Sequence, residues 1–162
     1  MAHVYINPNG LAGNYKRSHG PEYEKLRKEV TAVLESFKDI NGTQPISKIV
    51  KWEDADKEFN LPTDRVGDLV LGATTGYRLW EEMTEDRSYF STPRATGYKE
   101  GVDPMDPSMQ TPFIIAGPGV KKGLALAKPI RHIDQLPTIL NLMNVPIPEY
   151  VEGLSMKNSL MR

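Results

Sequence analysis

The chain has no cysteine at all, and only three of its 162 residues are histidine. Without cysteine there is no disulfide framework, no thiol nucleophile and no thiolate metal site. A composition free of cysteine fits a cytoplasmic protein and also permits a secreted one. No apolar run approaches the roughly 20 residues that a membrane-spanning helix needs, so no membrane span is expected.

The chain also lacks a charge excess and the short motifs of several enzyme classes. It carries 20 basic and 21 acidic residues, a formal net charge of -1. This balance gives no electrostatic reason to expect a nucleic acid polymer or an anionic membrane as a partner. No GxSxG elbow, P-loop or HExxH sequence is present. With 39% hydrophobic and 25% charged residues, the composition is that of an ordinary globular protein.

The first 60 residues predict a strand, a helix and a second strand. His3–Asn7 indicates a short strand, and Met1-Ala2 before it is expected to be an addition to an excised segment, without a signal peptide. Pro21 suits the first turn of a helix, and Ile46–Trp52 alternates like a half-buried strand. The helix is predicted to bury one apolar stripe, made of Tyr23, Leu26, Val30, Val33, Leu34 and Phe37.

The remaining residues predict two buried strands and a second helix. Gly67–Gly72 and Thr111–Gly117 are compact apolar runs, the pattern of strands covered on both faces. Asp134 is expected to cap the second helix. The buried stripe of that helix is predicted to be Leu136, Ile139, Leu140 and Met143. We therefore expect an α/β fold, with residues 1–60 as a small strand-helix-strand lobe and residues 61–162 as a sheet packed on this helix.

The histidines and acidic residues leave alternatives open. His3 is discounted because it adjoins the expected addition, whereas His19 could bind an anion with Lys16 and Arg17 or simply lie at a solvated helix entry. His132 and Asp134 could share a metal ion, although a helix cap beside a partly buried histidine is the plainer interpretation. Asp54, Asp56 and Glu58 are interpreted as a solvated face. Asp103 and Asp106 are interpreted as turn residues, and a divalent-ion site is the alternative for these two.

Several stretches, taken in order, resemble the alkaline phosphatase superfamily, and within it the type I phosphodiesterases and nucleotide pyrophosphatases. The most specific is Met109–Gly123, MQTPFIIAGPGVKKG. The others are Val4–Asn7, Glu22–Val30, Lys38–Thr43, Ile49–Asp54, Leu61–Val70, Pro129–Leu140 and a short loop with Gly153. The resemblance spans nearly the whole chain. It implies a cap-like lobe followed by the C-terminal part of an alkaline-phosphatase-like sheet.

The resemblance also implies chemistry that this chain does not contain. Members hold two divalent metal ions, commonly zinc, which stabilise charge on the phosphoryl oxygens and activate a Thr or Ser nucleophile. The nucleophile and most of the metal ligands belong to the family's N-terminal part, so no catalytic residue is assigned here. The substrate of the parent protein would be a phosphate ester or a phosphonate. We expect the chain alone to be inactive, and its uncovered apolar surface to favour self-association.

One family ligand would fall inside the chain. Members often place a metal-binding His before Gly-Tyr ahead of the Met109–Gly123 motif, whereas Thr96 stands at that position here. A hydroxyl is a poor zinc ligand compared with an imidazole, so no metal ligand is assigned. The resemblance implies that the loop around Thr96 forms the rim of an active site, where Arg94, Tyr98 and Lys99 would contact the substrate. The alternative is a solvated loop with ordinary charges. For the whole chain, the alternatives are a free-standing binding module of the same fold and an unrelated α/β domain.

Overall fold

The computed structural model describes residues 1–7, 15–79, 89–90, 103 and 105–160. The chain forms two compact units, Met1–Gln110 and Thr111–Arg162, which are described separately below. None of the helices in these described ranges is both long and apolar enough to cross a membrane. The sequence predicted a cap-like segment in residues 1–60 and a part of the family's core in residues 61–162. This division stays a prediction.

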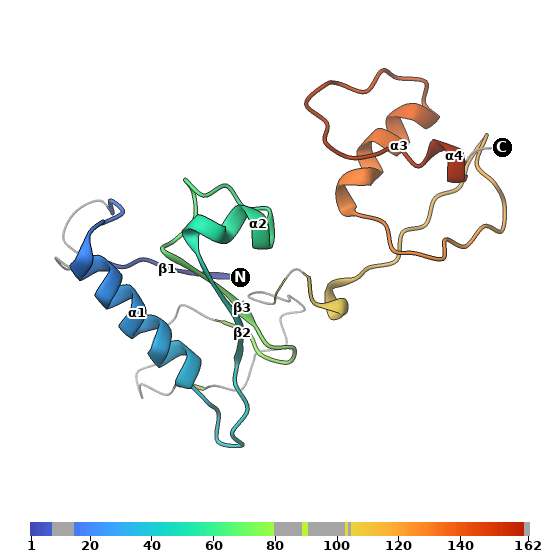
Figure 1. The fold of residues 1–162 in the computed structure, drawn as a ribbon. Helices are drawn as coiled ribbons and strands as arrows, with labels where there is room; N and C mark the ends of the chain where they lie inside the picture. Colours follow the sequence, from blue (N-terminus) through green and yellow to red (C-terminus); the bar gives the residue numbers. More distant parts are fainter. Residues whose placement is uncertain (8–14, 80–88, 91–102, 104, 161–162) are drawn as a thin grey trace. The chain divides into compact units, whose positions relative to one another are not determined.

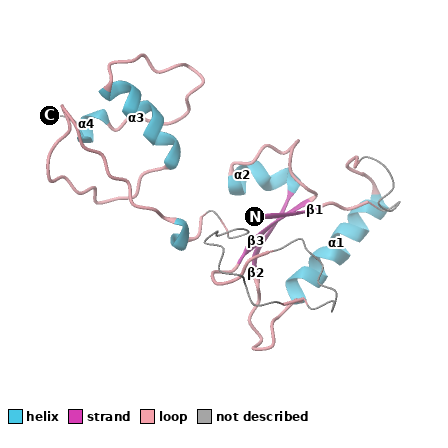
Figure 2. Cartoon of the chain, turned by 180° about the vertical axis from the view of Figure 1, so that it is seen from behind, coloured by secondary structure: helices cyan, strands magenta, loops and turns pink. Residues whose placement is uncertain are grey.

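Unit 1 is built on a three-stranded sheet in the order β1-β3-β2 (Figures 1 and 2). The strands are β1 (Ala2–Val4), β2 (Ile46–Lys51) and β3 (Leu69–Ala73). Strand β3 pairs antiparallel with both neighbours, so β1 and β2 run parallel to each other on either side of it. The predicted strand-helix-strand unit is therefore present, with β3 inserted between its two strands. This corrects the expectation that residues 67–72 belong to a sheet of the C-terminal part.

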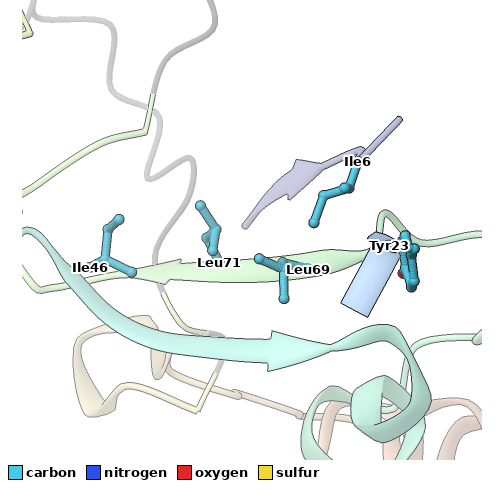
Figure 3. Close-up of a cluster of buried hydrophobic side chains, with 5 residues drawn as sticks. All are labelled: Ile6, Tyr23, Ile46, Leu69 and Leu71. Atoms are coloured by element: carbon cyan, nitrogen blue, oxygen red, sulfur yellow. The ribbon is translucent and has the colours of Figure 1, made fainter. Parts of the chain in front are cut away.

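Helix α1 (Pro21–Ser36) covers one face of the sheet. Its start at Pro21 is as predicted, because proline needs no hydrogen-bond partner in a first helical turn. Figure 3 shows the five buried side chains of the cluster under α1, with Ile46, Leu71 and Leu69 in a row along the sheet and Tyr23 and Ile6 at the far end from Ile46. Three further residues of the predicted stripe are half-buried and pack against this cluster: Leu26, Val30 and Leu34. Two residues of the predicted stripe are not part of this cluster: Val33, whose side chain is 66% exposed, and Phe37, which follows the end of α1 in an extended conformation.

The opposite face of the sheet is covered by the segment that joins β2 to β3. After a single 3₁₀ turn at Trp52–Asp54, helix α2 (Ala55–Phe59) buries Ala55 and Phe59 against Val50 and Val70. Asn60 ends α2 in the left-handed conformation, with φ 54°. The charged connector thus contains a short helix, and β3 is covered on both faces, as its apolar sequence indicates.

An irregularity in β2 changes which residues face α1. The pairing with β3 shifts between Ile46 and Lys48, which leaves Ser47 as an extra residue. Ile46 and Ile49 therefore both belong to the cluster under α1, while Val50 belongs to the cluster under α2. The predicted strict alternation, with Ile46 and Val50 on the same face, is wrong because a bulge inverts the side-chain sequence at that point.

Unit 2 contains helices and loops but no strand among its described residues. Helix α3 (Gln135–Leu142) follows a 3₁₀ turn at His132–Asp134, and α4 (Lys157–Leu160) lies near the end of the chain. Asn144, at φ 56°, follows the end of α3, in agreement with the predicted stop. The predicted strand Thr111–Gly117 is wrong: these residues form no strand in the structure. A strand needs neighbouring strands for its backbone hydrogen bonds, and unit 2 supplies none.

The predicted buried stripe of α3 is also wrong. The exposed fractions are 51% for Leu136, 42% for Ile139 and 67% for Met143, and only Leu140 of the four is half-buried. The side of α3 that faces its own unit carries Pro137 and Thr138 instead. The helix forms where the sequence predicts it, but the described part of unit 2 contains no sheet that could cover its apolar side.

Candidate functional site

The predicted substrate-binding residues Arg94, Tyr98 and Lys99, with Thr96 between them, lie outside the described residues. Their roles therefore stay predictions. The structure does describe where the same loop ends. Its last turn is a 3₁₀ helix, Pro107–Met109.

Residues at the end of this loop form a hydrogen bond and a close contact with residues at and just after the end of β3. Asp106 accepts hydrogen bonds from the Ser108 N–H at 2.7 Å and from the Thr75 hydroxyl at 2.5 Å. Asp103 accepts from the Met105 N–H at 2.9 Å, and a Cβ on Gly72 would lie 3.2 Å from the Cβ of Asp103. Both carboxylates therefore stabilise turns, which favours the turn interpretation over the divalent-ion alternative.

One extensively bonded polar side chain in the described part of unit 1 was missed by sequence reasoning. Asp68 immediately precedes β3 and is fully buried. Its carboxylate accepts hydrogen bonds from the Ile6 N–H at 2.5 Å, the Tyr15 hydroxyl at 2.5 Å and the Tyr23 hydroxyl at 2.7 Å, and the Arg17 Nε lies 3.3 Å from it. Only the isolated charge within the apolar run at residues 67–72 signals this role in the sequence.

The surroundings of Asp68 keep it ionised. Burial alone would raise its pKa, but the hydrogen bonds from Ile6, Tyr15 and Tyr23 and the charge of Arg17 outweigh burial, so the pKa lies below its usual value. Burial and the bond to Asp68 raise the pKa of Tyr23 to about 12. These four donors occupy the acceptor positions of the Asp68 carboxylate, so none is free for a ligand. Asp68 therefore has a structural role, because it joins four separate segments of unit 1.

Arg17 is occupied in the same way. Besides Asp68, its guanidinium donates to the carbonyl oxygens of Thr63 at 3.0 Å and Val66 at 2.5 Å. It also stacks over the Trp52 ring, 4.3 Å from the ring centroid. The predicted alternative in which Arg17 helps His19 to bind an anion is therefore not supported by the contacts of Arg17.

His3 and His19 have structural surroundings as well. His3 accepts a hydrogen bond from the Gly67 N–H through Nδ1 at 3.3 Å, and burial lowers its pKa. His19 lies at the entry of α1, with its ring 6.4 Å from that of Tyr23. Neither contact indicates chemistry.

In unit 2, Asp134 joins the start of α3 to the loop that follows the helix. Its carboxylate accepts from the Arg131 Nη2 at 2.7 Å and from the Leu154 N–H at 2.8 Å. The bonds from Arg131 and Leu154 outweigh burial and hold the pKa of Asp134 below its usual value. His132 is exposed. The carboxylate is thus used for structure. Asp134 stands at the N-cap position of α3 but its side chain makes no capping bond to that helix, so the predicted cap is wrong, as is the predicted partial burial of His132.

Two further contacts hold the same loop against α3. Thr138 donates to the Asp134 carbonyl at 2.6 Å and accepts from the Met156 N–H at 3.0 Å. Gly153 passes so close to Ile133 that a Cβ built on it would lie 1.9 Å from the Ile133 carbonyl oxygen. Only glycine fits at this backbone crossing.

No group of three or more His, Asp or Glu side chains that could hold a metal ion occurs among the residues that the structure describes. The described carboxylates discussed above are engaged by turns, by arginine or by backbone N–H groups. The described residues therefore position loops and helices, and they supply no complete reaction centre.

Comparison with known proteins gives two partial similarities, both to sulfatases. The chain is 42% identical to the Ulvan-active sulfatase of Formosa agariphila over 50 residues, which is 30% of this chain and 10% of that protein. It is 33% identical to human (Homo sapiens) Arylsulfatase K over 49 residues, 30% of this chain and 9% of that protein. The matched stretch thus spans about a tenth of the length of these curated relatives.

No protein-family model matches the sequence, and no solved structure matches it. Sulfatases are hydrolases of the alkaline phosphatase superfamily, so the chain has partial similarity to that superfamily. The similarity comes through sulfatases and gives no support to the phosphodiesterase branch in particular.

Proposed function

We propose that this chain is the C-terminal segment of a metal-dependent ester hydrolase of the alkaline phosphatase superfamily, and that it forms one side of the active site without supplying the nucleophile. The observation that carries the proposal is the 42% identity to a sulfatase over 50 residues. The ordered resemblance of Val4–Asn7 through Gly153 to the same superfamily supports it.

The substrate class we propose is a small organic sulfate ester, because the two matched proteins are sulfatases. A phosphodiester or phosphonate is the second candidate. The resemblance of Met109–Gly123 to the phosphodiesterase branch favours the phosphodiester, and the resemblance of Leu61–Val70 to the phosphonoacetate hydrolase branch favours the phosphonate. Both substrates present anionic tetrahedral oxygens. Arg94 and Lys99 would bind these oxygens through charge-assisted hydrogen bonds, with Tyr98 as a further donor.

The metal ions would be held elsewhere in the parent enzyme. Two divalent cations, with zinc as the first candidate, are implied by the family, but the donor set seen here does not fit them. The carboxylates of Asp103, Asp106 and Asp134 are taken by backbone N–H groups, Thr75 and Arg131. Thr96 offers only a hydroxyl. No reaction step is therefore assigned to a metal held by this chain.

Two assays and one gene sequence test the proposal. The purified 162-residue chain with added zinc should hydrolyse neither nitrophenyl sulfate nor bis(nitrophenyl) phosphate. The coding sequence ahead of Met1 should continue in frame and encode a Ser or Thr nucleophile with Asp and His metal ligands. Turnover by the chain alone would contradict the proposal, and a stop codon directly upstream would favour the free-standing binding module.

The same parent enzyme tests the rim residues. Arg94→Ala and Lys99→Ala should each raise KM about tenfold, the effect of losing roughly 1.4 kcal/mol of substrate binding. Lys25→Ala is the matched control, because its side chain is 79% exposed on α1 and its ion pair with Glu29 is long, at 3.9 Å. Unchanged KM in both rim variants would mean that the loop is not part of the site.

A further inference from the structure

The turn that joins α1 to β2 contains the dipeptide Asn41-Gly42 (Figure 1). Asn41, Gly42 and Thr43 are all exposed, and the preceding residue, Ile40, is 96% exposed. A residue that is exposed in the whole chain is also exposed in unit 1 taken by itself. The accessibility of this turn within unit 1 therefore does not depend on where unit 2 lies.

Gly42 leaves the backbone unobstructed beside the Asn41 side chain. It has φ 80°, in the left-handed region that favours glycine. Apart from its chain neighbours, no atom lies within 4 Å of the position where a Cβ would stand. A side chain at that position is what normally keeps a backbone nitrogen away from the carboxamide of a preceding asparagine. The Gly42 nitrogen can therefore approach Cγ of Asn41 whenever the turn opens.

Asp39 holds the turn in a conformation that opposes this approach. Its carbonyl oxygen accepts a hydrogen bond from the Gly42 N–H at 3.0 Å. Its carboxylate Oδ1 accepts from the N–H groups of Asn41 and Thr43, both at 2.8 Å. The Gly42 nitrogen can attack only after its hydrogen bond to Asp39 has opened, so the reaction rate should follow the fraction of time that the turn is open.

We propose that Asn41 is a site of spontaneous covalent modification, which Gly42 permits and Asp39 slows. In this step the Gly42 nitrogen gives its proton to the solvent and forms a bond to Cγ of Asn41, while the Cγ–Nδ2 bond breaks and ammonia leaves. Water then opens the cyclic imide at either carbonyl, which yields aspartate or its β-linked isomer at this position. Water is the only co-reactant, and nothing is oxidised or reduced. This inference does not depend on the proposed function.

The product would disturb the contact between this turn and the segment after β3. The Tyr77 hydroxyl donates to Oδ2 of Asp39 at 2.6 Å. The hydrogen bonds from Tyr77 and Thr43 outweigh desolvation and hold the pKa of Asp39 below its usual value, so Asp39 is ionised. A new carboxylate two residues away would repel it, and the β-linked isomer would also lengthen the backbone within the turn. Modification should therefore loosen the turn and weaken its contact with Tyr77.

Peptide mapping of the full 162-residue chain after storage in mildly alkaline buffer tests the site. Trypsin cuts after lysine and releases the peptide Asp39–Lys48, in which fragmentation should locate the replacement of –NH₂ by –OH at Asn41. Asn41→Gln should abolish the change, because its longer side chain must close a larger ring. Gln44 in the same peptide is the internal control and should stay unmodified. An unchanged Asn41 after storage would overturn the inference.

A second pair of variants tests whether Asp39 controls the rate. Asp39→Ala removes both hydrogen bonds to Oδ1, so the turn should open more often and the modification should proceed about tenfold faster. Tyr77→Phe is the matched control, because it removes only the hydrogen bond to Oδ2 and should change the rate less than about twofold. An unchanged rate in Asp39→Ala, or an equal rise in Tyr77→Phe, would contradict the role of Asp39.

Hydrogen exchange of the stored protein measures the loosening of the turn. The amides of Asp39 and Thr43 are hydrogen-bonded within the turn and should lose protection in the modified molecules. The amides of β3 should keep their protection. Asn41→Gln, stored in the same way, should retain the protection of the turn. Equal protection of Asp39 and Thr43 before and after modification would show that the product does not loosen the turn.

Discussion

Helices α1 and α3 carry the same kind of apolar pattern but meet different surroundings. In unit 1, the stripe of α1 packs on a sheet supplied by the same chain, and Tyr23 is only 2% exposed. In unit 2, described by itself, Leu136, Ile139 and Met143 of the predicted α3 stripe are exposed, and only Leu140 is half-buried. Helical periodicity therefore predicts which side chains form an apolar face. Whether that face is buried depends on which other segments are present to pack against it.

The two units also differ in how they are held together. Unit 1 combines two apolar clusters with a buried carboxylate, Asp68, that joins segments up to 62 residues apart in the sequence. Unit 2 relies on polar contacts around Asp134 and on the close crossing at Gly153. Variants at these positions should therefore separate the stability of one unit from that of the other.

The largest effect is expected from Asp68→Ala. Removing the carboxylate leaves the Tyr23 hydroxyl, the Ile6 N–H and the Arg17 guanidinium without their shared acceptor, at a cost of about 4 kcal/mol in the free energy of unfolding of unit 1. Tryptophan fluorescence during urea denaturation measures this, because Trp52 lies in unit 1 and the sequence from Thr111 to Arg162 contains no tryptophan.

Asp64→Ala is the control for Asp68→Ala. The Asp64 side chain is 77% exposed, and its contact with Arg65 is 3.8 Å long, so its loss should change stability by less than about 0.5 kcal/mol. If both substitutions lowered the free energy of unfolding by the same small amount, the hydrogen bonds of Asp68 would not be what stabilises unit 1.

The next effect is expected from Gly153→Ala. Its Cβ would lie 1.9 Å from the Ile133 carbonyl oxygen, a backbone atom that cannot move without shifting the start of α3. We expect a loss of about 3 kcal/mol in the stability of unit 2, at the upper end of overpacking costs. Hydrogen exchange of the α3 amides measures it, while the amides of β3 in unit 1 should keep their protection.

Gly123→Ala separates the clash from backbone strain. Gly123 has φ 69° but no atom within 4 Å of its Cβ position, so alanine there should cost only about 1 kcal/mol, the left-handed penalty alone. If both alanine variants reduced protection by the same amount, the close crossing at Gly153 would not be what holds the loop.

A smaller difference should appear at high pH. Burial and the hydrogen bond to Asp68 raise the pKa of Tyr23 to about 12, above the usual value of about 10. The folded state therefore binds this proton more tightly than the unfolded state. The resulting stabilisation is complete below pH 10 and is lost as the pH rises from 10 towards 12.

Urea denaturation of the unaltered chain and of Tyr23→Phe at pH 8 and pH 11 measures this contribution. The stability of unit 1 should fall between the two pH values in the unaltered chain and fall less in Tyr23→Phe, which has no proton to lose. The same pH dependence in both proteins would show that the Tyr23–Asp68 bond is not responsible.

Local signals in the sequence predicted most elements of unit 1. Pro21 and the apolar spacing that follows it determine α1, and the apolar run before Gly72 indicates a strand covered on both faces, as observed for β3. The pairing of β3 with β1 and β2 was not predictable from these signals, because strand order depends on contacts between distant segments. The bulge at Ser47 was missed for the same reason.

The site was less predictable than the fold. Asp68 acts through partners 45 to 62 residues away, and no local pattern distinguishes a buried carboxylate of this kind from a charged residue at a strand end. Thr111–Gly117 has the composition of a core strand, yet a strand forms only where neighbouring strands accept its hydrogen bonds. The rim residues Arg94, Tyr98 and Lys99 come from the family resemblance alone and stay predictions.

The smallest effect should come from the α3 stripe itself. Leu136→Ala removes a side chain that is 51% exposed, so the stability of unit 2 in the isolated chain should change by less than about 0.5 kcal/mol. Leu26→Ala is the matched change in α1, where the side chain packs on the buried cluster and its loss should cost about 2 kcal/mol. Hydrogen exchange of α3 and urea denaturation of unit 1 measure the two values. A large loss from Leu136→Ala would mean that the stripe already has a cover in the isolated chain, and the contrast between the two helices would disappear.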